Sequence, residues 1–219
     1  MLKLAQNIIQ QNGHVFIEGD WFPGHLPDNI RLEEMSYPDT NYSFASFFSE
    51  KPVGLRLGYA SGNYGHCLFI TGKNGEINIG KFCTMQCVRF VSNECIEIQD
   101  HVMISWGVTI TDSWLIDDTL STAMKRKMLE SAAQSLHRHL EFVRPHKVTI
   151  QENVWIGFEA VILPGVTIGR GSIIGAKTLV DQDVPPYSVV VGNPARVVKH
   201  LEATDTQDVK NRVLKEIIA

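Results

Sequence analysis

The clearest pattern along the chain is an aliphatic residue that returns every six positions between residues 150 and 185. These aliphatic positions are Ile150, Ile156, Ile162, Ile168, Ile174 and Val180. The fourth residue after each of them is small or β-branched: Val154, Ala160, Val166, Ser172, Thr178 and Val184. A period of six fits neither a helix nor simple strand alternation, but it fits a short strand followed by a turn. Three such units close one coil, so the pattern predicts an all-β solenoid, a parallel β-helix whose stacked coils share one interior.

A weaker array with the same period precedes this one. It runs through Ile79, Met85 and Val91, slips by one residue, and resumes at Ile98, Ile104 and Ile110. The two arrays together predict a β-helix over residues 77–200. Residues 1–76 are rich in aromatic and turn residues and lack a clean period, so we expect an N-terminal elaboration with imperfect coils.

An excursion over residues 113–147 separates the two arrays. Within it a four-residue spacing predicts a helix, for which Thr119 or Ser121 could serve as the N-cap. The residues that carry this spacing are Leu120, Met124, Met128, Ala132, Leu136 and Leu140. Residues 201–219 predict a second helix, which begins with a capping box at Thr204 and Gln207 and would seal the open end of the stack.

Composition narrows the possible partners. The 20 Lys and Arg residues are outnumbered by 24 Asp and Glu residues, so no basic field favours nucleic acid. No apolar stretch is long enough to span a bilayer, and the first eleven residues lack the apolar run of a signal peptide, which predicts a cytoplasmic protein. In that reducing compartment the four cysteines are expected as free thiols, and their spacing does not suggest a metal site.

Three stretches resemble the hexapeptide-repeat acyltransferase family, and most closely its sugar and surface-polysaccharide O-acetyltransferases. They are residues 103–112, residues 154–169, and the most specific one, Val-Gly-Asn-Pro-Ala-Arg at residues 191–196. The resemblance implies a left-handed β-helix and a homotrimer, with acyl-CoA lying in the groove between adjacent β-helices. It also implies transfer of an acetyl or other short acyl group from acyl-CoA to a hydroxyl or amine of a sugar-like acceptor.

The same resemblance suggests which residues bind acetyl-CoA. Turn residues matched to the family motif would contact pantetheine, and cations near the end of the stack would meet the phosphates. The turn residues are Gly157, Ala160, Gly175, Ala176 and Thr178, and the cations are Lys177, Arg196 and Lys199. Tight coils also require small residues, so the turn residues have a structural explanation as well. Trp106 and Trp114 are candidates for stacking on a sugar ring or on adenine, although indoles more often pack.

The resemblance leaves the catalytic base open. The family places a His just after the Asp that ends the first array, whereas here Asp112 is followed by Ser113 and Trp114. Asp112, His146 and His139, in that order, are our candidates for the base. Asp112 could instead bond turn amides, and His139 could decorate an exposed helix face. An amine acceptor would ease the problem, because a neutral amine attacks before it loses its proton.

Two other classes of protein use the same scaffold. One is a non-catalytic trimeric β-helix that binds a ligand or serves as a scaffold, which the absent His makes more credible. The other is the γ-type carbonic anhydrases, which hold zinc with three histidines, and for which His137, His139 and His146 could be recruited. The acyltransferase remains the preferred hypothesis.

Overall fold

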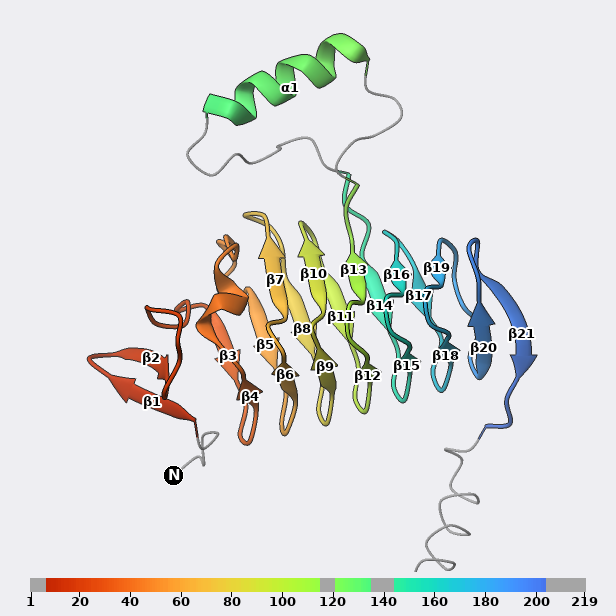
Figure 1. Cartoon of the computed structure of the whole chain (residues 1–219), viewed down its shortest axis with the longest axis horizontal. Helices are drawn as coiled ribbons and strands as arrows, with labels where there is room; N and C mark the ends of the chain where they lie inside the picture. The colour runs from red at the N-terminus through yellow and green to blue at the C-terminus, as the bar shows by residue number, and fades with distance from the viewer. Residues whose placement is uncertain (1–6, 115–120, 135–143, 204–219) are drawn as a thin grey trace, which may run out of the picture.

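The computed structural model describes residues 7–114, 121–134 and 144–203, and most of its strands pair in parallel in three sheets that run along one stack (Figure 1). Sheet I contains β3 (Ile30–Leu32), β5 (Leu55–Leu57), β8 (Ile77–Ile79), β11 (Ile96–Ile98), β14 (Val148–Ile150) and β17 (Thr167–Ile168). Sheet II contains β4 (Tyr37–Pro38), β6 (Gly62–Tyr64), β9 (Thr84–Gln86), β12 (Met103–Ile104), β15 (Trp155–Ile156), β18 (Ile173–Ile174), β20 (Ser188–Val191) and β21 (Arg196–His200). Sheet III contains β7 (Leu68–Thr71), β10 (Arg89–Ser92), β13 (Thr109–Thr111), β16 (Val161–Ile162) and β19 (Leu179–Val180).

The six-residue period is the path of the chain from one sheet to the next. In the regular coils, Trp155 of β15 pairs with Ile173 of β18, eighteen positions later, which is three units of six. All six aliphatic positions from Ile150 to Val180 have no exposed surface, and the small or β-branched positions between them are buried as well. Both predicted sets of side chains therefore fill the interior, where each coil covers the next.

The earlier coils are longer. Ile79 pairs with Ile98, nineteen positions later, which is the one-residue slip seen in the sequence. The stack begins at Ile30, which pairs with Leu55 twenty-five positions later, so residues 30–76 already contribute coils. The 3₁₀ helix η1 (Asn41–Phe44) and the loops around it take up the additional residues. Their interior is filled by a column of rings, Phe44, Phe69 and Phe90, with centroids 5.2 Å apart at each step.

The excursion leaves the stack after β13 and returns before β14. An antiparallel bridge between Ser113 and Pro145 forms its neck. The helix α1 (Thr122–Gln134) lies within the excursion, and its first turn is capped by Ser121, whose Oγ accepts a hydrogen bond from the Met124 N–H at 3.2 Å. Thr119 and the outer positions of the predicted helical spacing lie outside the described residues. The same is true of the predicted C-terminal helix from residue 204 onward.

Both ends of the described stack carry antiparallel strands. At the N-terminal end β1 (Ile8–Gln11) pairs with β2 (His14–Ile17), and at the other end β21 folds back on β20 (Figure 1). No helix in the described parts of the chain is long and apolar enough to cross a membrane. The four cysteines are free thiols, and burial raises the pKa of the Cys67 thiol to about 12.

Candidate active site

The outer face of sheet II carries an apolar column that no other described element covers. Met103, Trp155 and Ile173 lie in register on β12, β15 and β18. The Met103 side chain is 52% exposed and the Trp155 side chain is 48% exposed, which is unusual for large apolar groups. The Trp155 indole N–H points back along the stack and donates to the Ser105 Oγ at 3.4 Å.

Small residues form a second column beside the apolar one. Ser105, Gly157 and Gly175 follow the three strands, and each backbone N–H donates to the next coil, with N–O distances of 2.9, 2.7 and 2.8 Å. A Cβ at residue 157 would lie 2.8 Å from the Ala176 nitrogen, and a Cβ at residue 175 would lie 2.7 Å from the Val191 Cγ1. A Cβ would therefore meet backbone at residue 157 and a side chain at residue 175, and the two glycines leave their part of this column without side chains.

Two aromatic rings stand at the corner between sheets II and III. Trp106 and Phe158 stack with centroids 5.5 Å apart and an interplanar angle of 8°, and both are exposed. The same corner of the next coil holds Ala176, also exposed, and Lys177, whose side chain forms a 3.3 Å ion pair with Glu159. Along the stack, this corner therefore carries the stacked rings of Trp106 and Phe158, followed by Ala176 and Lys177.

The remaining predicted cofactor residues divide into two groups. Ala160 and Thr178 have no exposed surface, and the Thr178 Oγ accepts the Gly192 N–H at 3.3 Å, so their side chains belong to the interior. Arg196 and Lys199 lie on β21 at the end of sheet II, paired with Val191 and Val189. These two exposed cations are therefore on the last strand of sheet II, the sheet whose outer face also carries Met103.

Asp112 lies inside the stack, at the start of the neck. It has no exposed surface, and its carboxylate accepts hydrogen bonds from the Ser92 Oγ at 2.7 Å and from the backbone N–H groups of residues 93 and 94 at 2.9 and 3.0 Å. The Ser113 hydroxyl also donates to it. This environment shields the carboxylate from solvent, and hydrogen bonds from the protein occupy both of its oxygens. These are the properties of a residue that stabilises the neck.

His146 lies on the other side of the neck and is exposed. Its backbone N–H donates to the Asp112 carbonyl at 2.7 Å, and its carbonyl accepts the Gly165 N–H at 2.9 Å. Trp114, which is 45% exposed, is on the same neck. Strand β13 lies between Trp106 and this neck. Within one chain, Trp106 and His146 are therefore at opposite ends of β13, on the two sides of sheet III. His139 lies outside the described residues.

A cavity of about 860 Å³ lies elsewhere, on sheet I, and sequence reasoning did not find it. Its lining contains five acidic side chains, Glu33, Glu76, Glu97, Asp100 and Glu152, and three basic ones, Arg56, Lys81 and Lys147. No short motif marks this cavity, because neighbouring lining residues come from successive coils about twenty positions apart. Its excess of acidic side chains disfavours a polyanion such as a nucleotide, so the candidates for nucleotide binding remain those on sheet II.

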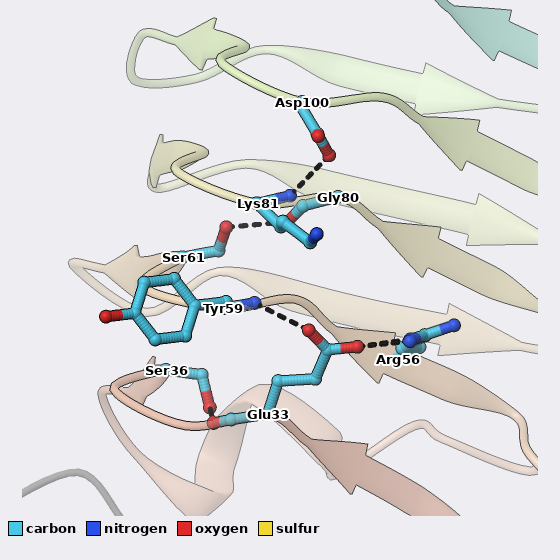
Figure 2. Close-up of polar contacts among 8 residues, drawn as sticks. All are labelled: Glu33, Ser36, Arg56, Tyr59, Ser61, Gly80, Lys81 and Asp100. Atoms are coloured by element: carbon cyan, nitrogen blue, oxygen red, sulfur yellow. Dashed lines mark hydrogen bonds and ion pairs between the residues drawn. The ribbon is translucent and has the colours of Figure 1, made fainter.

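Figure 2 shows how the cavity's wall is held together where β5 and β8 end. The Arg56 guanidinium donates to the Glu33 carboxylate, which also accepts the Tyr59 N–H at 3.0 Å. These hydrogen bonds, led by the one from Arg56, hold the pKa of Glu33 below its usual range. In the next coil the Asp100 carboxylate accepts the Lys81 N–H at 2.8 Å. At the far rim, the ion pair with Glu97 raises the pKa of Lys147.

Comparisons with known proteins agree with this architecture. A family model described as bacterial transferase hexapeptide (six repeats) matches residues 147–182. A putative acetyltransferase of Staphylococcus aureus is 46% identical over 66 residues, which are 30% of this chain and 33% of that protein. The chain thus spans about a third of the length of the curated relatives that it matches.

Two solved structures share the fold. A hexapeptide-repeat acetyltransferase from Vibrio cholerae, complexed with acetyl coenzyme A, is 29% identical with a TM-score of 0.51, over 68% of this chain and 72% of that one. A variant of AntD, an N-acyltransferase from Bacillus cereus in complex with dTDP and coenzyme A, is 18% identical with a TM-score of 0.57 over 88% and 87% of the two chains, which shows the fold alone. The fold is therefore the left-handed parallel β-helix of hexapeptide-repeat proteins. The predicted resemblance to hexapeptide-repeat acyltransferases is confirmed.

Proposed function

We propose that this protein is a CoA-dependent acyltransferase that moves an acetyl or other short acyl group to a hydroxyl or amine of a sugar-like acceptor. The observation that carries the proposal is the outer face of sheet II, where a column of small residues runs between apolar and aromatic columns and ends at Arg196 and Lys199. The acetyltransferase relatives and the acetyl-CoA bound to the Vibrio cholerae protein support it.

The order of residues on this face suits acyl-CoA in one direction, with its phosphates at the C-terminal end of the stack and its thioester near Trp106. Its phosphates would meet Lys177, Arg196 and Lys199, where the cations gather. Its pantetheine arm would cross Gly175 and Gly157, whose missing side chains leave room for it beside Ala176. The thioester would then reach the coil of Trp106, where the indole could stack on the acceptor. Ala160 and Thr178 would support this path from the interior.

The base for the acceptor would come from a second copy of the chain. His146 is the exposed candidate among the described residues, but β13 separates it from Trp106 in the same chain. We therefore propose a homotrimer in which the neck of one copy, with His146 and Trp114, faces the sheet II surface of the next. Asp112 is the positioning residue of that neck, and His139 remains a further candidate for the base.

The acceptor would lie between Trp106 of one copy and the sheet I cavity of the copy that supplies His146. Lys147 lines this cavity directly after His146 in the chain, so a molecule in the cavity would be near the proposed base. The many charged and amide groups of the lining suit hydroxyl and amine groups, and the acidic excess favours an amine over a phosphate. An acyl-CoA substrate also agrees with the cytoplasmic location that we expect.

Calorimetric titration with acetyl-CoA tests the proposal. We expect about one site per chain, and about tenfold or greater loss of affinity in a Lys177→Ala/Arg196→Ala double variant, because two phosphate contacts are removed. Lys73→Ala is the matched control, since its side chain is 72% exposed at the other end of the stack. Failure of wild-type protein to bind at millimolar acetyl-CoA would refute the acyltransferase assignment.

The absence of a His directly after Asp112 keeps the non-catalytic scaffold as a second candidate. A protein that binds acetyl-CoA but acylates neither amino sugars nor hydroxylated sugars would favour that candidate. The γ-type carbonic anhydrase hypothesis has less support, because the similar Staphylococcus aureus and Vibrio cholerae proteins are described as acetyltransferases. Carbon dioxide hydration by the zinc-loaded protein would reverse this ranking.

A further inference from the structure

Three potential metal ligands converge at the N-terminal end of the stack. His14 lies on β2, while His25 and Asp28 lie on the segment that leads to β3. One nitrogen from each imidazole and one carboxylate oxygen all lie within 4.8 Å of one another. Neither the hairpin nor this segment contributes to the proposed active site, and Figure 1 shows β1 and β2 at the end opposite β21.

The two segments that carry these ligands are fastened to each other. The Leu26 N–H donates to the Val15 carbonyl at 2.8 Å, and the Leu26 side chain is buried. The imidazoles of His14 and His25 stack with centroids 4.0 Å apart and an interplanar angle of 28°. Backbone pairing and packing therefore hold the two imidazoles together, and one ring turns about its side-chain torsions so that both in-plane lone pairs point at one ion.

Hydrogen bonding leaves a metal-binding lone pair on His25. Its Nδ1 lies 2.9 Å from the Leu26 carbonyl oxygen, which can only accept, so Nδ1 carries the proton. The Nε2 of the same ring is then unprotonated, as a metal ligand requires, and the Nδ1 bond to a carbonyl is the usual way in which proteins fix this tautomer. The His14 Nδ1 lies 3.4 Å from the Asp28 Oδ1, so the carboxylate is already beside the second imidazole.

We propose that His14, His25 and Asp28 bind a divalent transition-metal ion, with zinc as the best match. Two imidazole nitrogens and one carboxylate oxygen are a donor set that zinc accepts, with a water molecule completing a tetrahedron. The imidazoles disfavour calcium and magnesium, which prefer oxygen ligands. A cavity of about 420 Å³ lined by His14 and Asp28 provides room for the water.

The charge and the placement of the site indicate what the ion would do. Asp28 supplies one negative charge, while the Arg31 guanidinium is engaged by the backbone carbonyls of residues 28 and 30. The ion would cross-link β2 to the segment that enters the first coil, and would therefore hold the N-terminal hairpin against the end of the stack. The proposed role is structural and does not depend on acyl transfer.

Titration of the full chain, freed of metal by a chelator, tests this site. Zinc is followed by calorimetry, and cobalt by the visible absorption of a tetrahedral complex. We expect one ion per chain, an affinity at least about tenfold weaker in His14→Ala and in His25→Ala, and a smaller loss in Asp28→Asn. Zinc should also raise the thermal midpoint of the wild type and leave that of His25→Ala unchanged.

Two control variants show whether an ion binds elsewhere. His101→Ala removes a corner imidazole stacked on Phe82, and Cys87→Ser removes the exposed thiol, so neither should alter zinc affinity. Circular dichroism confirms that each variant is folded before titration. Absence of zinc and cobalt binding up to about 1 mM in the wild type, or wild-type affinity in His14→Ala and His25→Ala, would overturn the proposal.

Discussion

At the scale of single residues, Asp112 has a set of hydrogen bonds that only a carboxylate can complete. Its Oδ1 accepts the backbone N–H of residue 93 and its Oδ2 accepts that of residue 94. The sequence motif presents this Asp as a candidate for the chemistry, but the residue holds together the neck from which the excursion leaves. Loss of activity after its replacement would therefore not by itself identify a base.

The carboxylate geometry leads to a stability prediction for Asp112→Asn. Whichever way the new amide is oriented, its NH₂ group faces a backbone N–H that a carboxylate oxygen accepted before, and one donor loses its partner. We expect the free energy of unfolding to fall by about 1–3 kcal/mol, measured by denaturant titration. Asp100→Asn is the control, because one amide oxygen can still accept the single Lys81 N–H bond. Equal losses in the two variants would contradict this account.

Glu33 provides a pH-dependent prediction at the same scale. Its pKa is lowered in the folded protein by the hydrogen bond from Arg56, so the contact stabilises the fold above the ordinary pKa of about 4.5 and is lost as pH falls through the folded pKa. The pair is partly exposed, so the contribution at neutral pH is roughly 0.2–1 kcal/mol. Glu33→Gln should lower the unfolding free energy at pH 7, and the difference from wild type should shrink as the pH falls below the ordinary pKa of about 4.5. A difference that is constant across this range would show that the carboxylate charge contributes nothing.

At the scale of the elements, the turns of sheet II are constrained more by the neighbouring coil than by their own conformation. A Cβ at residue 157 would meet three backbone atoms of the next coil within 3.0 Å, whereas a Cβ at residue 175 would first meet the Val191 side chain. Backbone cannot move aside without breaking the ladder, while a side chain can rotate. The two glycines are therefore not equivalent, although the repeat makes them look so.

This difference can be measured with a pair of substitutions. Gly157→Ala should lower the free energy of unfolding by about 1–3 kcal/mol through overpacking, and Gly175→Ala should lower it by less. Thermal or denaturant unfolding of the two variants gives the comparison directly. If acetyl-CoA affinity falls in Gly175→Ala while stability is nearly unchanged, the column of small residues is part of the binding surface. A larger stability loss in Gly175→Ala would contradict the packing argument.

At the scale of the whole molecule, the stack leaves one long apolar column on sheet II. A single chain has no described element that covers Met103, Trp155 and Ile173, and the proposed base lies beyond β13 from this face. Both facts are explained if copies of the chain pack side by side, as the proposed homotrimer requires. The site would then be incomplete in a monomer.

Sedimentation equilibrium tests the assembly. The wild type should have about three times the 24.5 kDa mass of the chain, and Met103→Arg should shift the protein toward the mass of one chain, because a charge would be buried in the contact. Met35→Arg is a matched control, since Met35 is 51% exposed and Met103 is 52% exposed. A wild-type protein with the mass of one chain would refute the trimer.

The sequence by itself determined the coil. A period of six dictates which side chains point inward in the regular coils. In the earlier array the prediction for Val91 was wrong: Phe90 is the buried residue in register with Ile110, because the extra residue of this coil shifts the register. The predicted one-residue slip itself reappears as a nineteen-residue step between Ile79 and Ile98. It also indicated the excursion and offered Thr119 or Ser121 as the helix cap, of which the structure shows Ser121, because both features depend on residues close together in the chain. Local periodicity carries this information, since each coil stacks on the next in nearly the same register.

Only the tertiary structure decided which side chains meet. The burial of Asp112, the separation of Trp106 from His146, and the acidic cavity of sheet I depend on how far the coils are offset and where the corners fall. The grouping of His14, His25 and Asp28 depends on a hairpin that has no repeat at all. Contacts of this kind join segments whose separation in the chain varies with each loop, and no pattern in the sequence records that variation.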